Sequence, residues 1–489
     1  MGDGLMRGLA RYLRSVRPVV LLVTALACVA AVPAPAQAVI PPSVPRAVCD
    51  PGSLPERGAQ GRVTAADLAA GTGAHCNLEL IGHEGSLGGF RTYRYVDASG
   101  HECAFYDTTA YLPTRPSSAF LDPNLSGTHV LDMSDPAHPR RSADLTTPAM
   151  RSPHESLSLH AGRGLLAADM GSPTTAGPFV DVYDVKRDCR HPVLLSSLPI
   201  GVCGHEGSFS PDGNTYWVSC GAGFFAGGNV NRMGADKGFL TAVDVSDPVH
   251  PRALLTVTTL ASHGLNLSPD GATLYYAEVG AHKGLGVLDV NDIQQRRVNP
   301  RAQPLAQLSW DTVSIPQTAI PVSIGGHPYL VEVDEFASNI VKALVDGSGS
   351  DPAAMVGAAR IIDVADPRAP RVVSDIRLAV HSPEARAGAE AGDPGASVNG
   401  YAAHYCAVPR QDDPGIVACS FIASGLRVFD IRDPFHPVEI AYFNPPITTH
   451  DPYADFSAPA FVPERDEIWY TDGNHGFYTL RVTNGVWRR

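Results

Sequence analysis

Residues 243–251 read Val-Asp-Val-Ser-Asp-Pro-Val-His-Pro, and this short stretch decides the fold because the chain repeats it. Related stretches lie at residues 130–136, 182–188, 362–367 and 428–434, with partial copies at 286–292 and 478–482. A unit that recurs every roughly 40 to 60 residues indicates a repeat architecture, in which each copy buries its apolar face against its neighbours.

A second signature lies upstream of each copy and identifies the repeating unit. Ser-Pro-Asp-Gly, at residues 210–213 and 268–271, separates two short runs of alternating or β-branched residues. Proline presets φ and glycine takes the positive-φ position, so this pattern predicts a β-hairpin. The Val-Asp-Val run is then a third strand, and Asp-Pro-x-x-Pro turns the chain into a fourth, because proline cannot donate to a sheet ladder. Four antiparallel strands per repeat make a propeller blade.

Seven units can be counted, and the last one is incomplete. They begin at His83, His154, His205, His263, Gln317, His404 and near Phe456. The seventh unit stops after three strands, and residues 77–81 are expected to supply its missing outer strand and close the ring without free edges. The alternative is an unclosed solenoid. The prediction is an all-β, seven-bladed propeller of four-stranded antiparallel blades over residues 77–489.

The consensus of apolar residues, Asp, Val, Ser-Asp-Pro and Pro resembles the LVIVD repeat family of predicted bacterial β-propellers. The resemblance covers roughly residues 77 to 483 and implies the propeller fold. It implies no general activity, because that family carries none, so the function must be argued from the site.

The N-terminus predicts export. Four arginines within residues 1–18 precede an apolar run at 19–32, and Ala36-Gln37-Ala38 fits the small-x-small cleavage rule. Residues 1–38 are therefore expected to be a signal peptide and residues 39–76 a Pro/Gly-rich leader of a secreted protein. A retained membrane anchor is the alternative, but the run is shorter than the ~20 residues that span a bilayer. Lipid anchoring at Cys28 is disfavoured because the preceding residues match a lipoprotein box poorly.

The charge and cysteine counts narrow the partners and the compartment. Residues 1–38 hold four Arg and one Asp, so their removal takes the net charge from −13 to −16. An acidic surface argues against nucleic acid and anionic membranes as partners. The expected partner is an unidentified protein or glycan, and the protein is expected to be a monomer. Of nine cysteines, eight remain without Cys28, which in an exported protein indicates up to four disulfides. Cys406 and Cys419 are the expected pair, and Cys49 is expected to tether the leader.

One face of the propeller is predicted to be functional, because long connections vary there while the other face carries short, repeated turns. These connections are residues 171–178, 221–238, 335–357, 381–403 and 444–455. On this face, Asp334-Glu335 and Asp451 are possible Ca²⁺ ligands without the spacing of a calcium loop.

Histidines mark the expected starts of five inner strands, and propeller symmetry should bring them to one axis. They are His83, His154, His205, His263 and His404, with rim carboxylates Glu84, Glu155, Glu206, Asp169, Glu278 and Asp472. Imidazole and carboxylate together suit Zn²⁺, Cu²⁺ or Fe²⁺. Repetition itself favours a structural reading over metal binding, with each ring bonding to the backbone of the next blade once per repeat. A direct catalytic role is a third reading.

Two function classes follow from these observations. The first is an exported scaffold that binds a protein, glycan or small ligand through its loop-rich face. The second is a metal-dependent enzyme, an oxidoreductase or a hydrolase, with the histidines lining an axial site. Metal analysis of the purified protein discriminates between the two classes.

Overall fold

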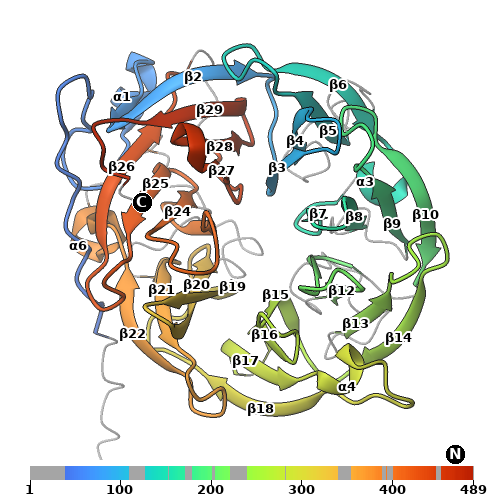
Figure 1. Cartoon of the computed structure of the whole chain (residues 1–489). Helices are drawn as coiled ribbons and strands as arrows, with labels where there is room; N and C mark the ends of the chain where they lie inside the picture. Colours follow the sequence, from blue (N-terminus) through green and yellow to red (C-terminus); the bar gives the residue numbers. More distant parts are fainter. Residues whose placement is uncertain are drawn as a thin grey trace, which may run out of the picture. The chain divides into compact units, whose positions relative to one another are not determined.

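Seven antiparallel sheets surround a common axis in the computed structural model, and each sheet is a propeller blade (Figure 1). The structure describes residues 39–108, 127–151, 153–170, 179–200, 204–220, 239–280, 282–339, 354–387, 393, 400–447 and 453–487. The sequence prediction of an all-β, seven-bladed propeller is confirmed.

Each blade runs from an inner strand at the axis to an outer strand at the rim (Figure 1). From inside to outside, blade one consists of β3 (Thr92–Val96), β4 (Glu102–Asp107), β5 (Thr128–Asp132) and β6 (Arg140–Leu145), and blade two of β7 (Ser158–His160), β8 (Leu165–Asp169), β9 (Phe179–Asp184) and β10 (Val193–Pro199). Blade three consists of β11 (Gly207–Phe209), β12 (Thr215–Cys220), β13 (Phe239–Asp244) and β14 (Arg252–Val257), and blade four of β15 (Ser262–Leu267), β16 (Thr273–Glu278), β17 (Gly284–Asp289) and β18 (Gln303–Leu308).

Blade five consists of β19 (Ile315–Ile324), β20 (His327–Glu335), β21 (Ala359–Asp363) and β22 (Arg371–Ile376), and blade six of β23 (Ala403–Ala407), β24 (Ile416–Phe421), β25 (Gly425–Asp430) and β26 (Val438–Asn444). Blade seven consists of β27 (Ala460–Val462), β28 (Glu467–Asp472), β29 (Gly476–Val482) and β2 (Leu78–Glu84).

The described residues also include a few short helical segments. They are α1 (Ala65–Ala70), α3 (Pro148–Arg151), α4 (Asn291–Gln294), η3 (Ala379–His381), α6 (Pro383–Arg386) and η5 (Pro463–Arg465). Among the described residues, none of these helices has the length and apolarity needed to span a membrane.

The repeated turns have the local chemistry that the sequence predicts. Gly213 and Gly271 of the two Ser-Pro-Asp-Gly turns have φ of +68° and +71°, which favours glycine. The Asp of the Val-Asp-Val run bonds inside its own turn, as when Asp244 Oδ1 accepts from the Ser246 amide at 3.1 Å. These local bonds end the third strand and leave its apolar side chains to pack between blades. Leu240 of β13 in blade three, for example, belongs to the same core cluster as Leu265 of blade four.

The ring closes between the two ends of the described chain, where β2 pairs with β29 in blade seven (Figure 1). Leu78 lies opposite Val482, and Leu80 opposite Leu480. The expected closing strand is therefore confirmed, and it extends further than residues 77–81. One expectation is wrong in consequence: His83 lies on this outer strand and does not open an inner strand, because blade one begins only at β3.

The leader is packed against the ring. Its strand β1 (Ala74–Cys76) pairs with β26 and gives blade six a fifth strand. Glu56 bonds to the buried Arg427 at 2.7 Å, and Arg427 also bonds to Glu439 at 3.0 Å. The guanidinium stacks over Tyr442, 4.5 Å from the ring centroid. Glu56, Arg427 and Glu439 are called the leader cluster below.

Disulfides reinforce the same regions. Cys49–Cys76 fixes the leader, and Cys406–Cys419 joins β23 to β24, so both expectations are confirmed. Cys103–Cys189 links blade one to blade two. Three disulfides within the described residues fit an oxidising, extracellular environment.

Most of the long connections assigned to the functional face, including Asp451, lie outside the described residues. The inner ends of the strands are described, and they form the site.

Candidate metal centre at the propeller axis

Four of the five predicted histidines meet at the axis. His154, His205, His263 and His404 come from blades two, three, four and six, and each is buried, with at most 9% of its surface exposed. The ring centroids of His154 and His205 are 4.8 Å apart, and those of His205 and His263 are 4.9 Å apart. The convergence expected from propeller symmetry is therefore real for these four.

The backbone around these residues departs from regular geometry. The β15–β16 ladder shifts register between Ser262 and Leu265, and the β23–β24 ladder between Ala403 and Cys406. Each bulge contains one of the histidines, and bulges characteristically redirect a side chain. His154 has φ of +52°, an uncommon value for a non-glycine residue. Such positions cluster at functional sites.

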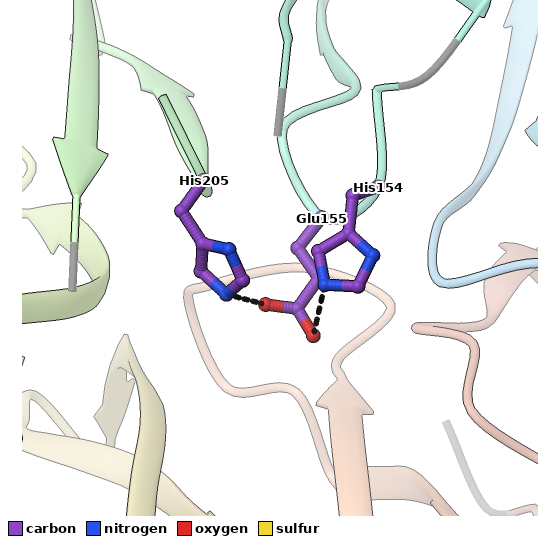
Figure 2. A group of neighbouring side chains, drawn as sticks. All are labelled: His154, Glu155 and His205. Carbon is purple, nitrogen blue, oxygen red and sulfur yellow. Dashed lines mark ion pairs between the residues drawn. The ribbon is translucent and has the colours of Figure 1, made fainter. Parts of the chain in front are cut away.

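Glu155 is the centre of the group, and Figure 2 shows its carboxylate between the rings of His154 and His205. Its carboxylate is 3.0 Å from His205 Nε2, 3.1 Å from His263 Nε2 and 3.3 Å from His404 Nε2. His154 Nε2 is 3.8 Å away. Four imidazoles from four blades therefore direct the same ring nitrogen at one buried carboxylate.

The other nitrogen of two rings binds the next blade. His263 Nδ1 donates to the Pro316 carbonyl at 2.8 Å, and His404 Nδ1 to the Phe456 carbonyl at 2.9 Å. A carbonyl oxygen only accepts, so Nδ1 carries the proton in both rings. This is the inter-blade bond of the structural alternative, and it leaves Nε2 for the axis. Metal-binding histidines typically have such a partner on the second nitrogen.

Blade five contributes a carboxylate where its neighbours contribute a ring. Glu335, at the end of β20, lies 3.1 Å from His404 Nε2 and 3.7 Å from His263 Nε2. The next residue, Phe336, has φ of +52°. His154, Glu155, His205, His263, Glu335 and His404 are called the axial cluster below. Asp334 does not join it, because it binds Arg360 at 3.0 Å.

A second layer beside the axial cluster neutralises another carboxylate. Glu206 forms an ion pair with Arg91 and accepts from the Tyr405 hydroxyl at 2.9 Å. Arg91 also lies over the Tyr405 ring, 4.1 Å from its centroid. Sequence reasoning placed Glu206 correctly near the axis and missed Arg91, Tyr405 and the axial position of Glu335. Nothing in the repeat pattern marks these three residues.

The axial cluster shifts its own pKa values in opposite directions. Burial lowers the pKa of His154 to about 3. Burial also disfavours charge on His263 and His404, but their contacts with Glu155 and Glu335 raise both pKa values to about 9. Burial opposes ionisation of Glu155, yet the surrounding imidazoles hold its pKa well below the usual range. The centre of the group therefore favours a carboxylate with positive charge beside it.

The remaining predicted residues do not reach this cluster and have local partners. Glu84 accepts from the Tyr106 hydroxyl at 2.9 Å, and Asp169 accepts from the Tyr216 hydroxyl at 3.4 Å. Glu278 accepts from the Gly280 amide at 2.7 Å. Asp472 lies 2.9 Å from the His475 ring, and the His83 ring bonds to the His475 carbonyl at 2.6 Å. Their positions follow from the strands that carry them. His83 and Glu84 lie on an outer strand, and the other three end second strands.

Two overlapping triads have donor atoms close enough to share one ion. They are His154, Glu155 and His205, and Glu155, Glu335 and His404, with the atoms of each triad within 4.8 Å of one another. Nitrogen and oxygen donors of this kind suit Zn²⁺, Cu²⁺ or Fe²⁺, which need three or four ligands at about 2.0–2.2 Å. The residues present therefore fit a transition-metal ion.

Comparison with known proteins gives the fold alone. No model of a known family matches the chain, which leaves membership of the LVIVD family unconfirmed, and no curated protein matches its sequence. The structure is similar to a periplasmic gluconolactonase of Pseudomonas aeruginosa, with 15% identity over 71% of this chain and 85% of that one and a TM-score of 0.48. It is also similar to hydrazine synthase of Kuenenia stuttgartiensis, with 12% identity over 82% of this chain and 97% of that one and a TM-score of 0.47. A putative 6-phosphogluconolactonase of Bacteroides uniformis is similar with 11% identity over 75% of this chain and 88% of that one and a TM-score of 0.47. At these identities and scores, no activity transfers to this chain.

Proposed function

We propose that the protein is an exported, metal-dependent propeller that binds one transition-metal ion in the axial cluster. The observation that carries the proposal is the convergence of three buried Nε2 atoms within 3.3 Å of the Glu155 carboxylate. A purely structural inter-blade bond needs only Nδ1, and it gives no reason for the second nitrogens to share one point.

Charge balance is compatible with one divalent ion. Glu155, Glu206 and Glu335 are each at most 2% exposed, and Arg91 pairs with Glu206. In the metal-free cluster, the two remaining negative charges are balanced by protons on His263 and His404, whose pKa values are raised to about 9. One divalent ion that displaces these two protons leaves the net charge unchanged, so the cluster holds a cation without an uncompensated buried charge.

An enzyme is the function class that this donor set favours. An ion held by histidines and a carboxylate supplies Lewis acidity or redox chemistry, as in metal hydrolases and oxidoreductases. The chain's own residues hold and orient the site: the Pro316 and Phe456 carbonyls fix two ring orientations, and Arg91 neutralises Glu206.

Metal analysis tests the proposal. Protein purified without chelator or metal-affinity resin should contain about one equivalent of metal, and the His205→Asn/His263→Asn double variant should contain none. The control is His138→Asn/His250→Asn, since both residues are exposed and pair with Asp135 and Asp247 in surface turns. No metal in the parent, and none taken up on titration with Zn²⁺, Cu²⁺ or Fe²⁺, overturns the proposal.

Export and family membership are parts of the proposal. The basic, apolar and Ala-x-Ala order of residues 1–38 supports signal cleavage before Val39, and the repeat consensus supports a place in the LVIVD family. Intact-mass measurement on culture supernatant checks the first. A chain that retains residues 1–38 overturns it.

A binding function has one specific observation in its favour, although on the face opposite the loop-rich one that the sequence predicted. A pocket of about 640 Å³ lies on the face with short turns, lined by Tyr329, Arg410, Phe435 and Trp487 among others. Aromatic and arginine side chains are typical of ligand contacts. Binding of glycans or peptides that is lost in Phe435→Ala, with metal content unchanged, would establish this second function.

A further inference from the structure

Gln317 occupies in blade five the position that histidines occupy in blades four and six. The β19–β20 ladder shifts register between Pro316 and Thr318, so Gln317 lies in a bulge like those that contain His263 and His404. The preceding carbonyl, that of Pro316, accepts from His263 Nδ1. Gln317 therefore lies next to the His263 position in the ring of inner strands.

The carboxamide of Gln317 is buried and unsatisfied. The residue has no exposed surface, and within the part of the chain that the structure describes neither Oε1 nor Nε2 has a hydrogen-bond partner. Leaving a buried polar group without partners costs about 1–3 kcal/mol. A polar amide at such a position calls for a ligand, a role that an apolar side chain would not serve.

The geometry points to Gln317 as the residue that positions a small exogenous ligand on the axial ion, of the class of water, hydroxide or a small inorganic anion. This inference rests on the proposed metal site. Three features of the position support it: the shared bulge, the adjacent Pro316–His263 bond and the two unused polar atoms. An amide provides a donor and an acceptor, which matches bound water or hydroxide, and its Nε2 hydrogens suit an anion.

Azide is the probe for this role. It is titrated into the Cu²⁺-loaded protein, and its charge-transfer absorption reports binding to the ion. Loss of one hydrogen bond to a charged ligand predicts that Gln317→Leu weakens azide binding by roughly tenfold or more, with Cu²⁺ content unchanged. The control is Thr318→Val on the same strand. Thr318 is also buried, but it is satisfied by Asn266 at 3.1 Å, so this variant should bind azide like the parent.

The stability of the metal-free protein separates this role from a structural one. Because Gln317→Leu removes two unsatisfied polar atoms, we expect its melting temperature to equal or exceed that of the parent. Thr318→Val should melt lower, because it leaves the Asn266 amide short of a partner. Such a gain in stability with a loss of binding is typical of functional residues.

The outcomes are distinguishable. If the parent takes up no metal, the proposed function fails and this inference fails with it. If the parent binds Cu²⁺ but not azide, or if Gln317→Leu binds azide as tightly as the parent, the inference alone is overturned. A Gln317→Leu variant that melts well below the parent assigns Gln317 a structural role and also overturns it.

Discussion

The leader cluster and the axial cluster are both buried and ionic, but their charges balance differently. In the leader cluster, Arg427 lies between the carboxylates of Glu56 and Glu439, and the amide of Gln60 adds a bond to Glu439 at 2.9 Å. The axial cluster gathers carboxylates and imidazoles around Glu155, with its nearest arginine already paired to Glu206. The first cluster is balanced by arginines, since Arg46 also pairs with Glu56 at 3.2 Å, whereas the second is balanced by protons on His263 and His404 that a metal ion can replace.

This difference teaches where to look for function in a repeat protein. Histidines recur at the axis in four of the seven blades, and recurrence alone favours a structural role. The bonds to the Pro316 and Phe456 carbonyls show that role for two of them. What the structural role does not explain is the shared direction of the Nε2 atoms and the positive φ of His154. Function is therefore indicated by the features of the axial residues that the repeated structure of the blades does not explain.

The largest expected effect is on the leader. Deleting residues 39–81 removes Glu56, the Cys49–Cys76 disulfide, β1 and most of the closing strand. We expect loss of cooperative unfolding, which is the whole stability of about 5–15 kcal/mol. A chain that lacks only residues 1–38 is the control and should melt like the parent. A 39–81 deletion that melts like the parent contradicts the closure of the ring.

The next effect breaks the leader cluster at its centre. Arg427→Leu leaves the buried Glu439 without its arginine and Glu56 with Arg46 as its remaining cation, which should cost about 3–5 kcal/mol of unfolding free energy by chemical denaturation. Metal content per folded chain should not change. Arg432→Leu is the control, because its ion pair with Asp430 is at the surface and should be worth at most about 1 kcal/mol. Equal losses in the two variants would mean that the leader cluster is not special.

Glu155→Gln tests the axial cluster in the same way. It should lower metal binding more than stability, whereas Arg427→Leu should lower stability and leave metal content unchanged. We expect metal affinity to fall at least tenfold. The metal-free protein should lose less stability than Arg427→Leu, since imidazoles can release protons when their carboxylate disappears, whereas carboxylates beside a missing arginine stay desolvated. Glu278→Gln is the control, because Glu278 bonds to Gly280 and Tyr276 in its own blade and does not belong to the axial cluster. Loss of metal in both variants would contradict a specific axial site.

The fold could be predicted from the sequence because its determinants are local and repeated. Ser-Pro-Asp-Gly, which occurs twice, and Asp-Pro-x-x-Pro, which occurs four times, fix turns through backbone geometry. Together with the partial copies of the Val-Asp-Val run, they predict seven blades and even the closing strand near residue 78. The axial cluster could be predicted in part, because symmetry places equivalent residues such as His205 and His263 together.

The remainder of the site depends on features with no sequence pattern. His83 was misassigned because Gly-His-Glu-Gly at residues 82–85 matches Gly-His-Glu-Gly at 204–207, although the first copy lies on an outer strand. Glu335 reaches the axis from the end of β20, and Arg91 from the position just before β3. Secondary-structure propensity marks neither residue as part of a site. Long-range convergence of single side chains becomes visible only in three dimensions.

The smallest expected effect concerns a buried carboxylate that belongs to neither cluster. Asp107 accepts from the Phe90 and Arg91 amides at 2.9 Å, and burial raises its pKa to about 7. In the unfolded chain its pKa is near 3.9, so between about pH 4 and 7 the folded state binds more protons, and this group's contribution to stability falls as pH rises. Asp107→Asn removes that loss while keeping an acceptor for both amides.

Asp107→Asn should therefore gain stability relative to the parent as pH rises from 5 to 8, by on the order of 1 kcal/mol in chemical denaturation. Asp244→Asn is the control with the opposite sign. Burial opposes ionisation of Asp244, but its bonds to Ser246 hold its pKa below the usual range, so this group titrates below the tested window. That variant should be less stable than the parent by the same amount at pH 5 and pH 8. A difference for Asp107→Asn that does not change with pH would mean that this carboxylate stays ionised in the folded state, balanced as fully as those of the leader cluster.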